Sequence, residues 1–447
     1  MRERLTSIAS RLQRYFSGAR TGVSGGTNAA PRAGAVKGWP DGEDILSDSV
    51  SRLAAARETP ALCVLACLPP AQTGIANSTL MAFREADFAV DIFAEYGSAP
   101  QYFKALGDDR LEHTRLSIFH QPSWVLALQR RQYSALVFVL GNSSHNLGAA
   151  LALRRLREFP TDLPIIIHLH DPCLLALVED YCKLESIEFD PTLRAHYAVP
   201  EETGSSLADF LAAGVYGLRV FLAELPITAI VVHSAAAKRI VAAEMPGVRI
   251  EVHPHPLLTP GARRNVPRAD FLTLGSFGNF DTEKRTELVT AAFRRLRETA
   301  PDARLVLAGY NAGDYADQHG LWSDSSITIH NAPADAEMAQ IMGSVDLAVQ
   351  LRRQDLGETS GVVTRLLSSG VPVIVSRLGS FAEYGDLVTY VEPEDGEAEV
   401  AAKILAQWRN GAAAPPLDQP ETYGGRHFCN LLMRLALEAG QANGRGA

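Results

Sequence analysis

The sequence has few cysteines and no long apolar stretch. Its five cysteines are an odd number among 447 residues, and most lie inside apolar runs. This pattern predicts reduced, buried thiols rather than a disulfide framework, and it favours the cytoplasm. No uninterrupted apolar run reaches the roughly 18–20 residues that cross a bilayer, and the N-terminus lacks the apolar core of a secretion signal. We therefore expect a chain that does not span a membrane.

Positive charge is also scarce, and so are the common nucleotide motifs. The formal net charge is -9, so we expect no broad basic face that could displace counterions from a nucleic acid. The sequence contains no GxxxxGK[ST] phosphate loop, and its glycine turn at 275–278 is not GxGxxG. The usual signatures of ATP hydrolysis and dinucleotide binding are thus missing. A polyanionic ligand would have to meet a local basic pocket.

Apolar residues, in contrast, make up 47% of the chain, and its length suggests two domains. From residue 61 onward, short aliphatic runs alternate with helical stretches. The first series predicts strands near 61–67, 88–93, 115–118, 135–140, 164–168, 228–232 and 249–252. The second predicts strands near 271–276, 304–308, 326–329, 345–350 and 371–375. Such alternation indicates an α/β protein with two doubly wound, Rossmann-like parallel sheets.

A proline-rich stretch separates the two series. Residues 253–270 carry four prolines and no periodic pattern, which predicts a domain hinge. Residues 3–16 form a basic amphipathic pattern that fits either peripheral membrane contact or docking on the protein itself, and 17–41 resemble a flexible linker. The expected divisions are an N-terminal helix and linker at 1–57, an α/β domain at 58–258, a second at 259–423, and a helix with a tail at 424–447.

The stretch "RRQDLGETSGVVTRLLSSGVPVIVS" at 352–376 predicts a strand–loop–helix–strand crossover. Ser360 is placed to cap the helix, so the amides of Gly361 and Val362 would face the loop at the carboxyl end of the sheet, where an anionic phosphate can bind. Glu358 fits two roles, either complementing the positive helix end or accepting hydrogen bonds from the hydroxyls of a sugar. Thr359 lies in the same loop.

A second loop, "SFGNFDTEKR" at 276–285, combines a glycine turn with two cations. We expect Asp281 to cap the following helix, with Lys284 and Arg285 in its first turn. Cations are disfavoured at that end of a helix, and a bound phosphate would explain them. The predicted diphosphate site therefore includes Lys284, Arg285, Gly278 and Asn279, although Arg285 fits a solvated face equally well.

With these loops, the chain resembles the retaining family-4 glycosyltransferases of GT-B fold, in which two Rossmann-like domains face each other across a cleft and a C-terminal helix crosses back. The ordered segments that carry the resemblance are "LPPAQTGIAN" (68–77), "LGNSSHN" (140–146), "IIIHLHDPCL" (165–174), "IVVHSAAAKRIV" (230–241), "SFGNFDTEKR" (276–285), "GETSGVV" (357–363) and "GSFAEYGD" (379–386). The resemblance implies sugar transfer from a UDP- or GDP-sugar to a glycan, glycolipid or other acceptor, with an acceptor domain at 58–258 and a donor domain at 259–423. It implies no other cofactor and no metal.

The resemblance also implies roles for individual residues. Lys284 would stabilise the departing diphosphate, Glu358 would contact sugar hydroxyls, and His170 would lie over the sugar. Gly74 would allow close approach of the acceptor-side loop. The chain departs from the family where a second glutamate normally holds the ribose, because that position is Leu366, or Arg365 when counted back from the G-x-P motif.

The sequence is also compatible with other interpretations. A catalytically silent subunit of the same fold would explain the missing glutamate, and a sugar-nucleotide epimerase would need an acid–base pair that the sequence does not single out. His168 and His170 share a strand face but have no third metal ligand at a known spacing. Trp322 and His330 fit either a base pocket or the core, and we expect Glu383 to be structural. A bacterial surface-glycan setting is the expected context, and the oligomeric state stays open.

Overall fold

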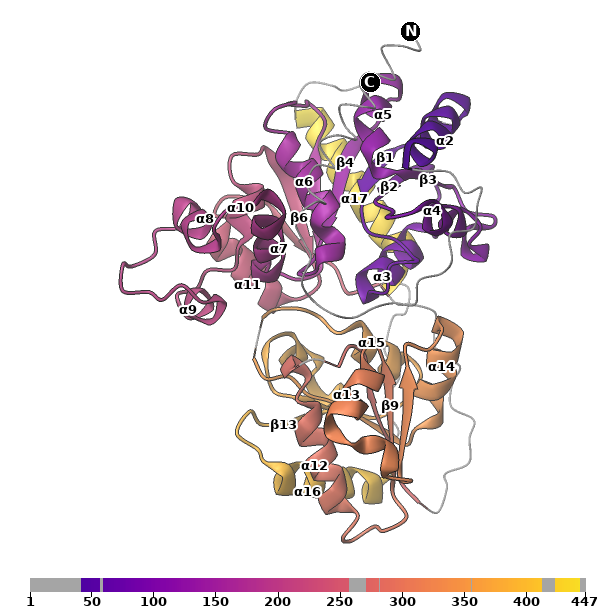
Figure 1. Ribbon diagram of the computed structural model, residues 1–447, viewed down its shortest axis with the longest axis vertical. Coiled ribbons are helices and arrows are strands. Elements are labelled where there is room, and N and C mark those ends of the chain that lie inside the picture. The colour runs from indigo at the N-terminus through magenta and orange to yellow at the C-terminus, as the bar shows by residue number, and fades with distance from the viewer. Residues whose placement is uncertain are drawn as a thin grey trace.

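The computed structural model describes residues 42–56, 59–256, 271–280, 282–354, 356–411 and 423–442. Figure 1 shows two α/β units, one above the other, each built around a sheet covered by helices. The predicted basic helix, the linker at 17–41, most of the proline-rich connector and Asp281 lie outside the described residues. Two doubly wound units confirm the predicted fold class.

The first unit contains a seven-stranded sheet in the order β3-β2-β1-β4-β5-β6-β7, with every pair parallel. All seven strands fall close to the predicted runs. Because helices cover both faces, the central strands are buried throughout and read as continuous aliphatic runs. The strands are β1 Leu62–Leu65, β2 Val90–Ala94, β3 Leu116–His120, β4 Ala135–Leu140, β5 Ile165–Leu169, β6 Ile227–Val232 and β7 Ile250–Val252.

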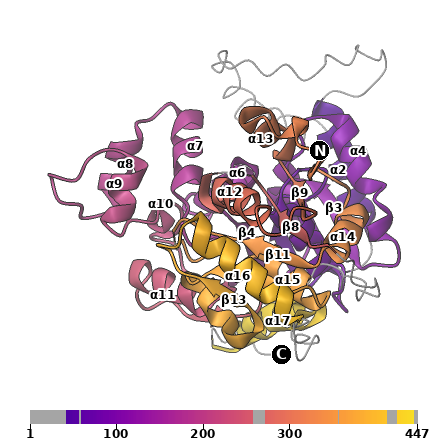
Figure 2. The same ribbon diagram turned by 90° about the horizontal axis from the view of Figure 1, so that it is seen from below.

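Helices connect and cover these strands. They are α3 Gly74–Phe83, α4 Ala99–Leu106, α5 Trp124–Arg130, α6 Leu147–Arg155, α7 Leu175–Glu185, α8 Phe189–His196, α9 Leu207–Ala212, α10 Leu218–Leu222 and α11 Ala235–Glu244, with short turns η1 Asp109–Leu111, η2 Gln121–Ser123 and η3 Ser144–Asn146. Four of the helices, α7 to α10, fill the long connection between β5 and β6. From below, α8 and α9 project to one side of the molecule (Figure 2).

A further helix, α2 Gly42–Ala55, precedes β1 and packs on the first unit. Ile45 and Leu53 are buried, and Ser49 Oγ accepts a hydrogen bond from the His120 amide at 3.0 Å. Arg52 donates to the Ile118 carbonyl at 3.0 Å. These contacts tie residues 42–55 to the first unit, although the sequence-based boundary groups them with the N-terminal linker.

The second unit contains a six-stranded parallel sheet in the order β10-β9-β8-β11-β12-β13. The strands are β8 Thr273–Phe277, β9 Arg304–Gly309, β10 Ile327–Asn331, β11 Leu347–Gln350, β12 Val373–Ser376 and β13 Thr389–Val391. The sequence predicts all but the short edge strand β13. The helices are α12 Thr286–Leu296, α13 Ala312–His319, α14 Asp335–Ser344, α15 Gly361–Ser368 and α16 Glu397–Asn410, with turns η4 Thr282–Lys284, η5 Leu321–Ser323 and η6 Gly379–Leu387.

The last helix, α17 Gly425–Ala442, returns from the second unit to the first. In Figure 1 it runs behind the upper sheet, and it contacts α3, β5 and β6. Phe428 is fully buried and meets Phe83 edge to face, with 5.8 Å between ring centroids. Gly425 lies so close to the Ala82 carbonyl that a β-carbon would come within 2.3 Å of its oxygen. The predicted crossing helix is thereby confirmed.

The cysteines and the helix lengths can be compared with the sequence predictions on thiols and membrane spans. All five cysteines are buried and free of disulfides, as predicted. Within the described residues, no helix combines the length and apolar character needed to cross a bilayer.

Candidate functional site

A cleft of about 1490 Å³ lies between the two units. It is lined by the loops at the carboxyl ends of strands from both sheets, where ligands of open α/β sheets bind. The residues that line it include ten predicted site residues: Gly74, His170, Gly278, Asn279, Lys284, Glu358, Thr359, Ser360, Gly361 and Val362. The structure thus brings the two predicted loops of the second unit to one cavity.

Helix α15 opens onto this cleft as its sequence predicts. The Ser360 hydroxyl accepts a hydrogen bond from the Val363 amide at 3.3 Å, and the first intrahelical bond runs from Thr364 N to Ser360 O at 3.2 Å. The amides of Gly361 and Val362 precede that bond, so they are the helix-end donors that can meet an anion. A β-carbon at position 361 would lie 3.2 Å from the His255 ring, so glycine leaves room for that histidine.

The loop after β8 differs from its prediction in two respects. Lys284 ends the turn η4, and α12 starts two residues later at Thr286, so Lys284 precedes the helix instead of lying in its first turn. Arg285 adopts a left-handed conformation with φ of 48°, and its guanidinium donates to the carbonyls of Pro393 and Asp395 at 3.1 and 3.4 Å. The backbone turn directs Arg285 to that segment, and it does not line the cleft.

The backbone of the same loop packs closely against the end of β9. Gly278 has a φ of 111° and donates its amide to the Ala308 carbonyl at 3.1 Å. A β-carbon on Gly309 would come within 1.8 Å of the Gly278 carbonyl oxygen. Two glycines are therefore needed where the ends of β8 and β9 meet. Asn279 Oδ1 accepts from Asn311 Nδ2 at 2.7 Å, which fixes the next side chain along the cleft.

Glu358 is held by an arginine that the sequence reasoning did not assign. Arg352 Nε donates to Glu358 Oε1 at 3.1 Å, and both side chains are mostly buried. The Arg352 guanidinium also lies over the Phe381 ring, 5.1 Å from its centroid. The Glu358 carbonyl accepts from Ser380 Oγ at 2.6 Å. The carboxylate therefore has a fixed position at the cleft and is not a mobile loop charge.

Asp171, at the end of β5, is a second cleft residue that was missed. Its carboxylate accepts a hydrogen bond from the backbone amide of Asn142 at 2.7 Å. Burial, and after it the charge of Glu358, raise the pKa of Asp171, while Asn142, Lys284 and Arg352 lower it, and the net result is a pKa of about 6. Asp171 thus lies within electrostatic reach of the charged groups of the other unit.

Leu366 and Arg365 lie on different sides of α15. Leu366 is fully buried in the apolar core of the second unit, so that position presents no polar group to the cleft. Arg365 lines the cleft, and its guanidinium contacts the Asp335 carboxylate at 2.9 Å. Asp335 also lines the cleft, at the start of α14. The Asp335 carboxylate of α14 therefore lies next to Arg365, one of the two positions at which the family resemblance implies a glutamate.

Glu383 joins the two units. Its carboxylate accepts from the amides of Ala235 and Ala236 at 2.9 and 2.7 Å, which caps α11 of the first unit. Nearby, the Gly357 carbonyl accepts from Ser234 Oγ at 3.1 Å. These contacts hold the Glu358 loop against the first unit.

Trp322 and His330 lie outside the cleft lining. The Trp322 side chain is 58% exposed and donates to Asp317 at 2.7 Å. His330 lies 3.9 Å from Glu337. Neither residue joins the residues grouped around Lys284 and Glu358.

Solved structures share this architecture at low sequence identity. Sucrose-phosphate synthase from Thermosynechococcus elongatus is 14% identical, with 86% of this chain and 98% of that chain covered and a TM-score of 0.55. Anabaena Alr3699/HepE in complex with UDP-glucose is 14% identical, with 86% and 100% covered and a TM-score of 0.52. WaaG, a glycosyltransferase involved in lipopolysaccharide biosynthesis, is 13% identical, with 85% and 98% covered and a TM-score of 0.51.

The chain has the GT-B fold. Residues 270–410 of this GT-B chain match the family described as "Glycosyl transferases group 1", which supports the glycosyltransferase class. No curated protein sequence matches the chain.

The residues that the sequence analysis missed differ in their local signals. Asp171 follows His170 directly in the HD segment, which offered a usable clue. Arg352 belongs to an arginine pair after β11, but only the folded loop brings it to Glu358. Asp335 had no such signal, because its partner Arg365 lies 30 residues further along the chain.

Proposed function

We propose that the chain is a glycosyltransferase that moves a sugar from a UDP- or GDP-sugar to an acceptor, with retention of anomeric configuration. The observation that carries the proposal is the convergence of Lys284, the N-terminus of α15 and Glu358 on one cleft between the two units. The match of the second unit to glycosyl transferases group 1 supports it. So does the fold shared with Alr3699/HepE, which was solved with UDP-glucose.

The leaving diphosphate sets the main electrostatic requirement. Cleavage of the sugar–phosphate bond builds negative charge on the diphosphate and positive charge on the sugar, so fixed positive groups at the phosphate favour the transition state. In our proposal Lys284 and the amides of Gly361 and Val362 supply them, each through a charge-assisted hydrogen bond of about 1.5–3 kcal/mol. No divalent ion is assigned to the diphosphate.

The sugar would lie between Glu358 and His170. Arg352 fixes the Glu358 carboxylate, which can then accept hydrogen bonds from sugar hydroxyls. Thr359 Oγ1 is buried and has no hydrogen-bond partner among the described residues, so it offers a further polar contact for a ligand. In a retaining front-face reaction the departing phosphate removes the proton from the acceptor hydroxyl, and no separate protein base is needed.

The first unit would bind the acceptor and the second unit the donor, with the division in the proline-rich connector and Gly74 on the acceptor side. We assign the ribose to Asp335, because Leu366 is buried and Asp335 is the carboxylate that Arg365 holds at the cleft. We further propose a cytoplasmic enzyme of bacterial surface polysaccharide or glycolipid assembly, for which the five free cysteines are suitable.

A panel of nucleoside diphosphates and nucleotide sugars tests the proposal. A binder of the folded state raises the unfolding temperature by mass action, and the sugar nucleotide identified in this way is then assayed for transfer. We expect Glu358→Gln to retain the fold and lose turnover, while Glu392→Gln, outside the cleft lining, keeps both. Tight nucleotide binding without turnover by any donor would favour a catalytically silent subunit. Release of an epimerised sugar without acceptor would favour an epimerase.

A further inference from the structure

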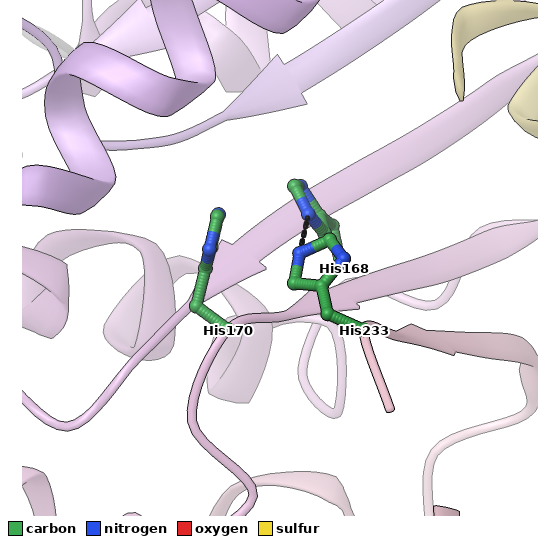
Figure 3. Close-up of side chains that lie close together, drawn as sticks. All are labelled: His168, His170 and His233. Carbon is green, nitrogen blue, oxygen red and sulfur yellow. Dashed lines mark hydrogen bonds between the residues drawn. The ribbon is translucent and has the colours of Figure 1, made fainter. Parts of the chain in front are cut away.

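Three buried histidines lie together behind the cleft, and the proposed transfer reaction uses only one of them. His168 and His170 come from β5, and His233 follows β6. One ring nitrogen from each can be chosen so that all three lie within 4.8 Å of one another. Figure 3 shows the three rings side by side, with His168 and His233 joined by a hydrogen bond. We call them the histidine trio.

The hydrogen bonds of the trio define which nitrogens have free lone pairs. His233 Nδ1 donates to the His253 carbonyl at 2.9 Å, so its Nε2 carries a lone pair. His168 Nε2 lies 3.0 Å from that atom and must be the donor, which leaves His168 Nδ1 as an acceptor. Both His168 Nδ1 and His170 Nε2 are buried without a hydrogen-bond partner among the described residues.

Two unpartnered ring nitrogens in one buried cluster are unusual, because buried polar atoms in proteins are nearly always satisfied. A cation would occupy these two free lone pairs. The His233 Nε2 lone pair, which accepts the hydrogen bond from His168, would bind the ion in place of that bond. Protonation is the other way to use a lone pair, but burial and the neighbouring histidines lower the pKa of all three rings well below the usual value. Neutral imidazole is the form that binds metals.

We propose that His168, His170 and His233 bind one divalent transition-metal ion of the Zn²⁺ class. Three imidazole ligands are a common set for zinc, with bonds of about 2.0–2.1 Å that place tetrahedral ligand atoms roughly 3.4 Å apart. The trio needs only a modest closure to reach that spacing. The bond from His233 Nδ1 to a carbonyl is also the arrangement that orients a metal-binding ring.

The neighbouring residues show how an ion could reach the histidine trio and which segments it would hold in place. His170 lines the cleft, so an ion can enter from that side and a water or cleft ligand can take the fourth position. The His255 ring lies 4.8 Å from His233 between centroids and packs on Gly361. A bound ion would therefore fix the ends of β5 and β6, with the start of the connector, next to the phosphate-binding end of α15. One ring nitrogen of His170 suffices for the ion, and the ring stays in the cleft lining.

Zinc titration of the full chain, stripped of metal with a chelator, tests this site directly. We expect one Zn²⁺ per chain by calorimetry and a rise of several degrees in the unfolding temperature. His233→Asn should weaken zinc binding by about 100-fold or more, since loss of even an outer partner costs roughly 10–100-fold. The matched control His427→Asn changes an exposed histidine near His253 that is outside the trio, and its zinc affinity should stay unchanged.

Absence of zinc binding by the wild-type chain, or equal affinity in His233→Asn, would overturn the proposal. If His233→Asn fails to fold, X-ray absorption on the zinc-loaded wild-type protein decides. Three imidazole nitrogens at about 2.0–2.1 Å support the site, and fewer than three imidazoles overturn it. Because these measurements use zinc alone, their outcome is independent of whether the chain transfers sugars.

Discussion

The ionisable groups on the two sides of the cleft lie in different environments. At the ends of β5 and β6, the first unit buries groups whose charged form is disfavoured: the pKa of Asp171 is raised to about 6, and that of His170 is lowered. At the ends of β8 and β11, the second unit presents Lys284 and the Arg352–Glu358 pair. We call the side of the first unit, with Asp171 and His170, the desolvated wall. We call the side of the second unit, with Lys284 and the Arg352–Glu358 pair, the charged wall. The transfer that we propose builds charge on the sugar and the diphosphate, and the charged wall would stabilise the diphosphate.

The largest expected effect comes from removing the cation of the charged wall. Lys284→Ala should lower the rate of sugar transfer by about 10²–10³-fold, the usual loss when one preorganised charge-stabilising donor is deleted. Lys284 lies in a short turn before α12, so we expect the unfolding temperature to change little. Steady-state kinetics and thermal unfolding measure the two quantities.

Arg294→Ala is the matched control, because it removes an exposed cation from the helix that follows Lys284. It should behave as wild type in both measurements. A Lys284→Ala protein that unfolds much earlier yet binds nucleotide normally would make Lys284 a structural residue, and the contrast between the walls would fail.

Much of the fold could be predicted from the sequence, because its signals are local. Among the described residues, the aliphatic runs located twelve of the thirteen strands, and Ser360 marked the start of α15 correctly. The edge strand β13 escaped because it has three residues and is only partly buried. Helix α2 follows a linker-like composition, and its contacts with Ser123 and Ile118 lie more than 60 residues away.

The site was harder to predict because its partners are distant in sequence. The glycine–cation loop favoured Lys284 and left Arg285 open between the phosphate site and a solvated face, and the left-handed backbone at Arg285 separates the two side chains in the structure. His233 lies 65 residues from His168, so no local spacing could indicate it as a third ligand. Sequence patterns identify loop ends, whereas the pairing of loops across the cleft follows from the packing of the two units.

The desolvated wall predicts a pH effect on stability. The pKa of Asp171 is raised from 3.8 to about 6 by burial and then by Glu358, so the folded chain keeps a proton that the unfolded chain releases near pH 4. The stabilising contribution of this proton is complete below pH 4 and is lost as the pH rises through 6. Asp171→Asn should remove this loss, which is about 3 kcal/mol for a pKa shift from 3.8 to about 6 at 1.36 kcal/mol per pKa unit.

Denaturant unfolding at pH 4.5 and 7.5 provides the measurement. The variant should gain stability relative to wild type at the higher pH. Asp314→Asn, an exposed acid of the same cleft, should show no such gain. Equal pH profiles for wild type and Asp171→Asn would mean that the first wall is not desolvated at this residue.

A smaller effect is expected where the walls are joined. Glu383→Ala removes the carboxylate that caps α11 across the two units, and loss of a helix cap typically costs about 0.5–2 kcal/mol. Thermal unfolding should report the decrease, and Asp386→Ala, an exposed acid three residues away, should not reproduce it. If both variants unfold at the wild-type temperature, the Glu383 cap does not stabilise the contact between the two units.

The smallest change concerns Asp335, the carboxylate of the charged wall that we assign to the ribose. Asp335→Asn keeps an oxygen for Arg365 but accepts hydrogen bonds from ribose hydroxyls less strongly, because charge-assisted bonds exceed neutral ones. Nucleoside diphosphate affinity should fall about 3- to 10-fold, or roughly 1 kcal/mol, with the turnover number nearly unchanged. Glu337→Gln alters a carboxylate of the same helix outside the cleft and should leave the affinity intact. Equal affinities in calorimetry for both variants would move the ribose elsewhere, while a larger loss for the free base than for the nucleotide would assign Asp335 to base recognition.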